Sequence, residues 1–241
     1  MHLRVKRGPL NRIAAAVIVL AGTVSGASAG SVDLFDLAGN FDQSSFGSNG
    51  GSTQYAQTVI ADGDFWSDLS VRLTNLPGNV GGTFSLDIYG VRNASLPGTG
   101  WAPDANNQLF TTILTHTGTG LEAFTVAPNL NVTSGAGYVF VLNTFLGNGA
   151  GSLGTLDNTT VRATDFNGPT DHYLGGEFLY SNDGRAITNS STWFSRFGYN
   201  EDLAFQANFG TATPVPLPAS LPLLLAGLGG LGFLSRRKKA S

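Results

Sequence analysis

The sequence contains no cysteine. The chain therefore has no disulfide bridge, no thiolate ligand for a metal ion and no cysteine nucleophile. Basic residues are scarce between the terminal segments: five arginines and no lysine accompany all sixteen acidic residues of the chain. The net charge of this part is about −11, which argues against nucleic acid as a partner, because phosphates attract basic surfaces.

The start of the chain has the pattern of a secretory signal peptide. Basic residues precede a short apolar run, residues 13–24, and Ala27 and Ala29 form an A-x-A cleavage site. The run is too short for the usual membrane span, although an uncleaved anchor is the alternative. We predict a signal peptide over residues 1–29 and a mature chain that begins at Gly30.

The other end of the chain has three parts in a fixed order. An apolar run over residues 215–234 would span about 30 Å as a helix, the thickness of a bilayer core. Its first residues form a Pro-rich motif: Val215, Pro216, Leu217, Pro218 and Ala219. A basic cluster follows it, and such clusters stay on the cytoplasmic side: Arg236, Arg237, Lys238 and Lys239.

This order resembles the PEP-CTERM sorting signal of Gram-negative bacteria in its VPLPA variant, which residues 215–219 match letter for letter. The resemblance covers residues 215–241. It implies recognition by an exosortase, a membrane-embedded cysteine protease-transferase that would cut near the motif. It also implies a transient inner-membrane anchor, followed by delivery to the cell surface or to an exopolysaccharide matrix. An ordinary single-pass tail anchor is the alternative.

The body between these segments has the sequence pattern of β-strands. Apolar residues alternate with polar ones, the pattern of half-buried strands, at Leu69, Val71 and Leu73, at Phe84, Leu86 and Ile88, and at Leu203, Phe205, Ala207 and Phe209. Residues 138–142 are apolar on both faces and predict a central strand. Weaker strands are expected at residues 32–37, 55–60, 109–115, 123–126, 160–163 and 177–180. We predict an all-β antiparallel sandwich or jelly roll over residues 30–210 and a linker over residues 211–214.

The later part of the body carries a looser resemblance. Gly175-Gly176, Tyr180, Asp183-Gly184, Trp193 and residues 202–205 are similar to the closing strands of choice-of-anchor proteins, which are secreted bacterial β-sandwiches. The resemblance implies a jelly-roll fold and no defined activity.

Two stretches offer ligand chemistry. Asp62, Asp64 and Asp68 place hard oxygen ligands in and beside a glycine-containing loop, an arrangement that calcium uses, although plain turn acids are the alternative. No other cofactor is expected. Trp101 stands among glycines, and an exposed ring there would stack on a sugar face. Trp66 and Trp193 are expected to pack in the core or at the sandwich ends.

Hydrolytic chemistry has weak sequence support. His116 is expected to face solvent, and the stretch with Asp165, Asp171 and His172 lacks a Gly-x-Ser-x-Gly elbow. A glycosidase would need two acids about 5–10 Å apart across a cleft, and the candidates are Glu122, Glu177 and Glu201. We expect an exported, non-enzymatic surface or matrix protein. The alternative is a carbohydrate-binding module, with or without the aid of calcium, and a hydrolase comes last.

Overall fold

The computed structural model describes thirteen strands, all of them in two antiparallel sheets. The residues that it describes are 30–37, 41–42, 46, 53–75, 82–94, 96, 100–117, 120–144, 159–164, 171–183, 186–195 and 201–211. The predicted signal peptide, with Ala27 and Ala29, lies outside the described residues, as does the predicted sorting segment, residues 215–241. Within the described part of the chain, no helix is long and apolar enough to cross a membrane.

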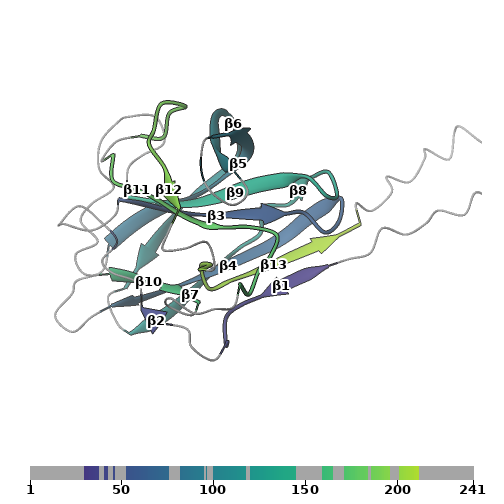
Figure 1. Cartoon of the computed structure of the whole chain (residues 1–241). Coiled ribbons are helices and arrows are strands. Elements are labelled where there is room, and N and C mark those ends of the chain that lie inside the picture. Colours follow the sequence, from purple (N-terminus) through teal and green to yellow (C-terminus); the bar gives the residue numbers. More distant parts are fainter. Residues whose placement is uncertain are drawn as a thin grey trace, which may run out of the picture.

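The first sheet is built around the long strand β4. Two strands, β13 and β10, pair with its successive halves, and β1 and β2 extend the sheet beyond them, while β7 and β8 also pair with β4. Its strands are β1 (Ser31–Asp33), β2 (Phe41–Asp42), β4 (Phe65–Asn75), β7 (Leu121–Val126), β8 (Leu130–Asn131), β10 (Thr159–Ala163) and β13 (Phe205–Gly210). Figure 1 shows β1, β2, β4, β7, β10 and β13 in the lower part of the view.

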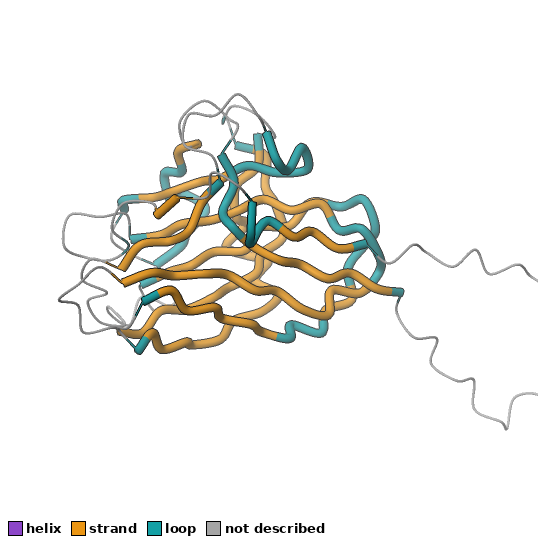
Figure 2. The backbone as a smooth tube through the Cα atoms, turned by 90° about the horizontal axis from the view of Figure 1, so that it is seen from below, coloured by secondary structure: helices purple, strands orange, loops and turns teal. Residues whose placement is uncertain are grey.

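The second sheet has the order β12-β11-β3-β9-β5-β6, and every pairing in it is antiparallel. Its strands are β3 (Gln54–Ile60), β5 (Gly82–Asn93), β6 (Trp101–His116), β9 (Gly137–Asn143), β11 (Phe178–Ser181) and β12 (Phe194–Ser195). The backbone trace shows the strands running lengthwise through the molecule with loops joining them (Figure 2). The predicted antiparallel β-sandwich is therefore confirmed.

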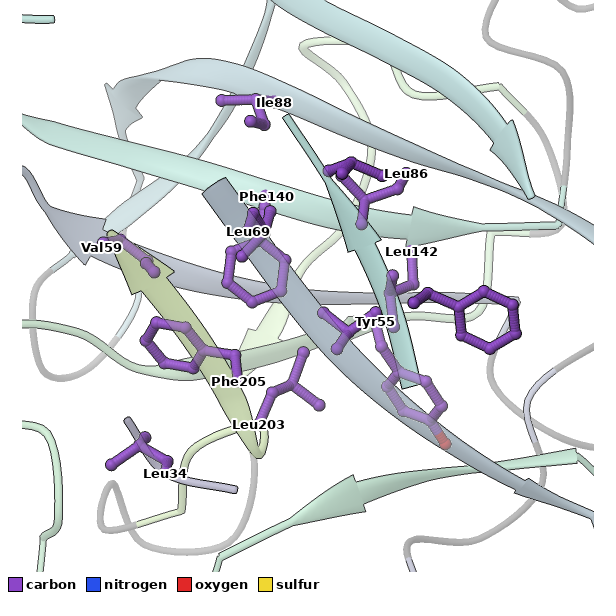
Figure 3. Packing of buried hydrophobic residues seen from close by; sticks show 14 of the residues in the cluster. Leu34, Tyr55, Val59, Leu69, Leu86, Ile88, Phe140, Leu142, Leu203 and Phe205 are labelled. Atoms are coloured by element: carbon purple, nitrogen blue, oxygen red, sulfur yellow. The ribbon is translucent and has the colours of Figure 1, made fainter. Parts of the chain in front are cut away.

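The main core lies between the two sheets and is rich in aromatic rings. Leu69, Phe140 and Phe205 are fully buried there, and Figure 3 shows their side chains close together between the strands. The ring centroids of Phe140 and Phe205 lie 5.3 Å apart in an edge-to-face arrangement, which aromatic pairs favour. The alternation that predicted these strands thus points the apolar residues inward, as a period of two requires.

The six-stranded sheet is covered on its outer face as well. A second buried cluster contains Ala56, Val139 and Val141 from its central strands together with Ile187 and Trp193 from the segment 186–195. This explains why β9 is apolar on both faces: it lies between β3 and β5 and is packed from both sides. The predicted central strand at residues 138–142 is confirmed.

The strand β6 differs most from the expectation. The sequence indicated a strand only over residues 109–115, but β6 runs from Trp101 to His116 and contains two irregularities in its register with β5. Residues 104–107 loop out opposite Gly90, and Leu109 is an extra residue between the pairs Tyr89↔Gln108 and Ile88↔Phe110. The sequence did not predict this extension, because it contains Pro103, Asn106 and Asn107, which are residue types typical of turns.

Candidate sorting segment, chain ends and buried polar sites

The strand that leads to the predicted sorting segment is held on both sides. β13 pairs with β4 along its whole length and with β1 over Gln206–Asn208. It ends at Gly210, so only the linker separates it from Val215. The five steps along the chain from Gly210 to Val215 can span at most about 18 Å.

The predicted mature N-terminus lies at the same end. The Phe209 N–H donates to the carbonyl oxygen of Gly30 at 2.8 Å, and Figure 1 shows β1 and β13 side by side. A side chain at Gly30 would collide with the Asp62 carboxylate, so glycine is the residue that fits here. Signal-peptide cleavage before Gly30 would leave the new N-terminus beside the strand that carries the tail.

The turn with Asp62 and Asp64 ties these two chain ends together. The Gly30 N–H donates to the Asp62 carbonyl at 3.1 Å, and the Asp64 N–H donates to the Gly210 carbonyl at 3.0 Å. Gly63 has a φ of 153°, and a Cβ there would lie 2.6 Å from the Gly210 oxygen. The turn therefore needs glycine at this close approach to β13.

The described structure does not bring Asp62, Asp64 and Asp68 together in one cluster. The Asp64 carboxylate accepts the Ser134 N–H at 3.4 Å, the Asp62 carboxylate lies against Gly30, and Asp68 stands in β4 opposite Asn208. Nowhere in the described ranges do three His, Cys, Asp or Glu side chains gather in a way that could hold a metal ion. The observed contacts of Asp62 and Asp64 are those of turn residues.

Trp101 is half-buried rather than openly exposed. It begins β6 opposite Asn93, and its ring lies so close to Gly137 that a Cβ there would come within 2.5 Å of it. Trp66 and Trp193 are buried, as predicted. The contact with Gly137 uses part of the Trp101 ring surface that a sugar would need.

Asp202 is the centre of a buried polar node that the sequence did not reveal. Its carboxylate accepts the Gln57 side-chain N–H at 2.7 Å and the Tyr173 backbone N–H at 3.1 Å. The other end of the Gln57 amide accepts the Leu203 N–H at 2.8 Å, so this side chain joins β3 to the segment before β13. Burial raises the pKa of Asp202 to about 8, although the hydrogen bond from Gln57 opposes the shift.

A second buried carboxylate lies on the other face of the six-stranded sheet. Asp87 on β5 accepts hydrogen bonds from Thr111 at 2.5 Å, from Ser85 at 2.8 Å and from Gln108 at 3.3 Å. Burial raises the pKa of Asp87, and these donors partly offset that shift. The side chains of Thr111 and Gln108 thereby fix β6 to β5.

One sequence signal could have pointed to these nodes. Gln57 occupies the same face of β3 as Tyr55 and Val59, which both face the core. A polar residue at an inward position must find a partner, because an unpaired buried amide costs about 1–3 kcal/mol. The identity of that partner depends on how the chain folds, and residue 202 is too far along the sequence to be inferred.

The residues considered for hydrolysis lie in structural positions. His116 is 1% exposed, not solvent-facing as expected, because its ring packs 5.8 Å from that of Phe124. Glu177 and Glu201 are each 2% exposed, which corrects the expectation that they are solvated acids at strand edges. The Glu177 carbonyl accepts the Thr58 N–H of β3 at 3.0 Å. The Glu201 carbonyl accepts the Phe178 N–H at 3.2 Å and so joins the segment before β13 to β11.

The remaining candidates make local contacts. Glu122 accepts hydrogen bonds from the backbone N–H and the hydroxyl of Thr117, each at 3.1 Å. Asp171 accepts the Tyr173 N–H at 3.0 Å, and His172 is half-buried beside it. Asp165 lies outside the described residues. The described geometry therefore does not assemble a nucleophile, base and orienting acid from these residues.

Comparison with known proteins distinguishes the tail from the body. No curated protein and no solved structure matches this chain. Residues 214–239, however, match the family model of the PEP-CTERM protein-sorting motif. The chain thus carries a PEP-CTERM sorting signal directly after the last strand of its β-sandwich.

Proposed function

We propose that this chain is an exported, non-enzymatic β-sandwich protein that an exosortase processes near Val215–Ala219 and that then serves a structural or adhesive role. Its destination is the cell surface or an exopolysaccharide matrix. The observation that carries the proposal is the sorting signal at residues 214–239, which follows β13 after a few residues.

The chain's own residues give the signal a physical basis. While the protein is exported, the apolar run enters the bilayer and Arg236–Lys239 remain inside, because each charge costs roughly 2.5–3.5 kcal/mol at the bilayer centre. This holds Val215–Ala219 at the outer boundary of the membrane. Prolines 216, 218 and 222 disfavour a regular helix there and leave an extended backbone that a protease can bind.

The test is removal of the exosortase gene from the producing cells, followed by fractionation. We expect the protein to keep its tail and to stay in the inner membrane. A variant that ends at Pro214 should be exported without a membrane anchor in both the parent and the exosortase-free strain. Tail-free protein at the surface of cells without exosortase would contradict the proposal and favour a different protease.

Carbohydrate binding stays the alternative function, and it has its own test. Binding of the exported protein to matrix polysaccharide would be compared with that of the Trp101→Ala variant. Because the ring also packs on Gly137, unfolding curves of both proteins are needed to separate lost binding from lost structure. Absence of binding by the unsubstituted protein would remove this alternative.

A further inference from the structure

The edge strands of the two sheets differ in how well they are protected against pairing with a further strand. Among the strands that the structure describes, β6 is the last of the six-stranded sheet, and β5 is its neighbour on one side. A strand in this position presents every second N–H and C=O group to an incoming strand. Natural edges are commonly protected by charge, and β1 and β7 carry Asp33 and Glu122.

β6 lacks such protection over its regular part. No charged residue stands between Asp104 and the end of the strand at His116. The irregularity at Leu109 separates this part from the bent start of the strand, so Phe110–His116 pair regularly with Gly82–Ile88. Two copies of the body, each with a net charge of about −11, repel each other. This uncharged edge is a place where a second copy could approach.

The exposed face of this edge is self-complementary about Ile113. Ile113 is 56% exposed, and Thr111 and Thr115 on either side of it are also exposed. If two copies of Phe110–His116 pair antiparallel over their full length, Ile113 lies opposite Ile113 of the second copy. Each Thr111 then lies opposite a Thr115, and cross-strand β-branched and threonine pairs of this kind are favourable.

We propose that β6 pairs along its outer edge with β6 of a second copy, antiparallel and with Ile113 on the two-fold axis. The pairing joins two six-stranded sheets into one continuous sheet and removes both unprotected edges. It goes beyond the proposed function, because it concerns how the body associates and does not depend on where the protein is delivered.

The absence of native cysteine makes the register directly testable. In the full-length chain, Ile113→Cys should form a disulfide-linked dimer on export, because directly opposed strand residues have Cα atoms about 4.5–5.5 Å apart, within disulfide range. Thr115→Cys is the matched control on the same face of the same strand. Its two copies would stand about 13 Å apart along the strands, too far for a disulfide.

A second control separates pairing from random collision. Leu174 is 87% exposed, so Leu174→Cys is more accessible than Ile113→Cys. On a non-reducing gel, we expect a dimer fraction for Ile113→Cys several times that of either control. Equal cross-linking in all three variants, or none at Ile113→Cys, would overturn the proposal.

The non-covalent dimer provides an independent measurement. Light scattering of the exported protein should show a dimer that Ile113→Lys converts to a monomer, because two lysines would then face each other across the axis. Leu174→Lys should leave the dimer intact, and unfolding curves confirm that each variant is folded. A monomer for the unsubstituted protein at all concentrations would overturn the proposal.

Discussion

The body and the tail of this chain differ in how they depend on the sequence. The tail is recognised from the order of residue types along a short segment, residues 214–239. The body depends on contacts between residues that are far apart, such as the hydrogen bond between Gln57 and Leu203, 146 positions later in the sequence. We therefore expect delivery and folding to be separable in this chain. Changes in the body should alter stability and leave sorting intact, and changes in the tail should do the reverse.

The largest effect on the body is expected at the inner core. Phe140 is fully buried and packs against Phe205, so Phe140→Ala removes these contacts and leaves a cavity between the sheets. We expect a loss of about 3–5 kcal/mol in the free energy of unfolding. Denaturant unfolding of the exported protein measures it, with Leu121→Ala on an exposed position as the control.

Sorting should not respond to the Phe140→Ala substitution. Variant protein that reaches the membrane should lose its tail in the same fraction as the unsubstituted protein. A tail that remains attached to folded Phe140→Ala protein would show that the exosortase also reads the body.

The next effect concerns pH. Burial holds the pKa of Asp202 at about 8, far above its ordinary value of 3.8, and the charges of Asp171 and Glu177 add to the shift. The folded state therefore keeps a proton that the unfolded chain loses near pH 4. The stability from this proton is complete below pH 4 and is lost as the pH rises toward about 8, a change of several kcal/mol.

Asp202→Asn tests this prediction, because asparagine has the shape of the protonated acid without its titration. We expect the unfolding free energy of the variant to fall less steeply between about pH 5 and about pH 8 than that of the unsubstituted protein. Burial also raises the pKa of Asp87, and any contribution from that group is common to both proteins. Parallel curves for the two proteins would contradict the assignment to Asp202.

A smaller effect is expected at the outer cover of the six-stranded sheet. Trp193 is buried in the second cluster, but it belongs to the segment 186–195 rather than to a central strand. Trp193→Ala should cost no more than about 3 kcal/mol, the lower end for a buried aromatic residue. Hydrogen exchange should increase first in residues 186–195 and β11, while amides of β9 stay protected. Equal loss of protection in both regions would show that the cover and the core unfold together.

The smallest effect is expected at Leu174, which is 87% exposed. Leu174→Ser should change the free energy of unfolding by no more than about 0.5 kcal/mol. A larger loss in denaturant unfolding would mean that this side chain is covered in the functional assembly.

The sequence predicted the sheets well where one face of a strand is buried. Leu69, Val71 and Leu73 alternate with polar residues and are all buried in β4. It predicted less where the structure departs from a simple two-layer sandwich. The irregular first part of β6, residues 101–108, and the cover formed by residues 186–195 have no periodic pattern, since their positions depend on contacts with distant strands.

The polar nodes were the least predictable part of the body. Asp87 and Asp202 are acidic residues of the kind usually found at surfaces, and only the folded chain brings Thr111 and Gln57 to them. Local pattern therefore cannot distinguish them from solvated acids. The tail was predictable for the opposite reason, because its motif, apolar run and basic end are contiguous in the sequence.

The most direct test of the central proposal is the intact mass of the protein isolated from the cell surface and the medium. The account predicts a chain that begins at Gly30 and ends near the motif Val215–Ala219, together with any group that the exosortase attaches. Removal of the exosortase should shift the mass to that of a chain that ends at Ser241. Surface protein that retains residues 220–241 in cells with a working exosortase would contradict the account and leave a simple tail anchor.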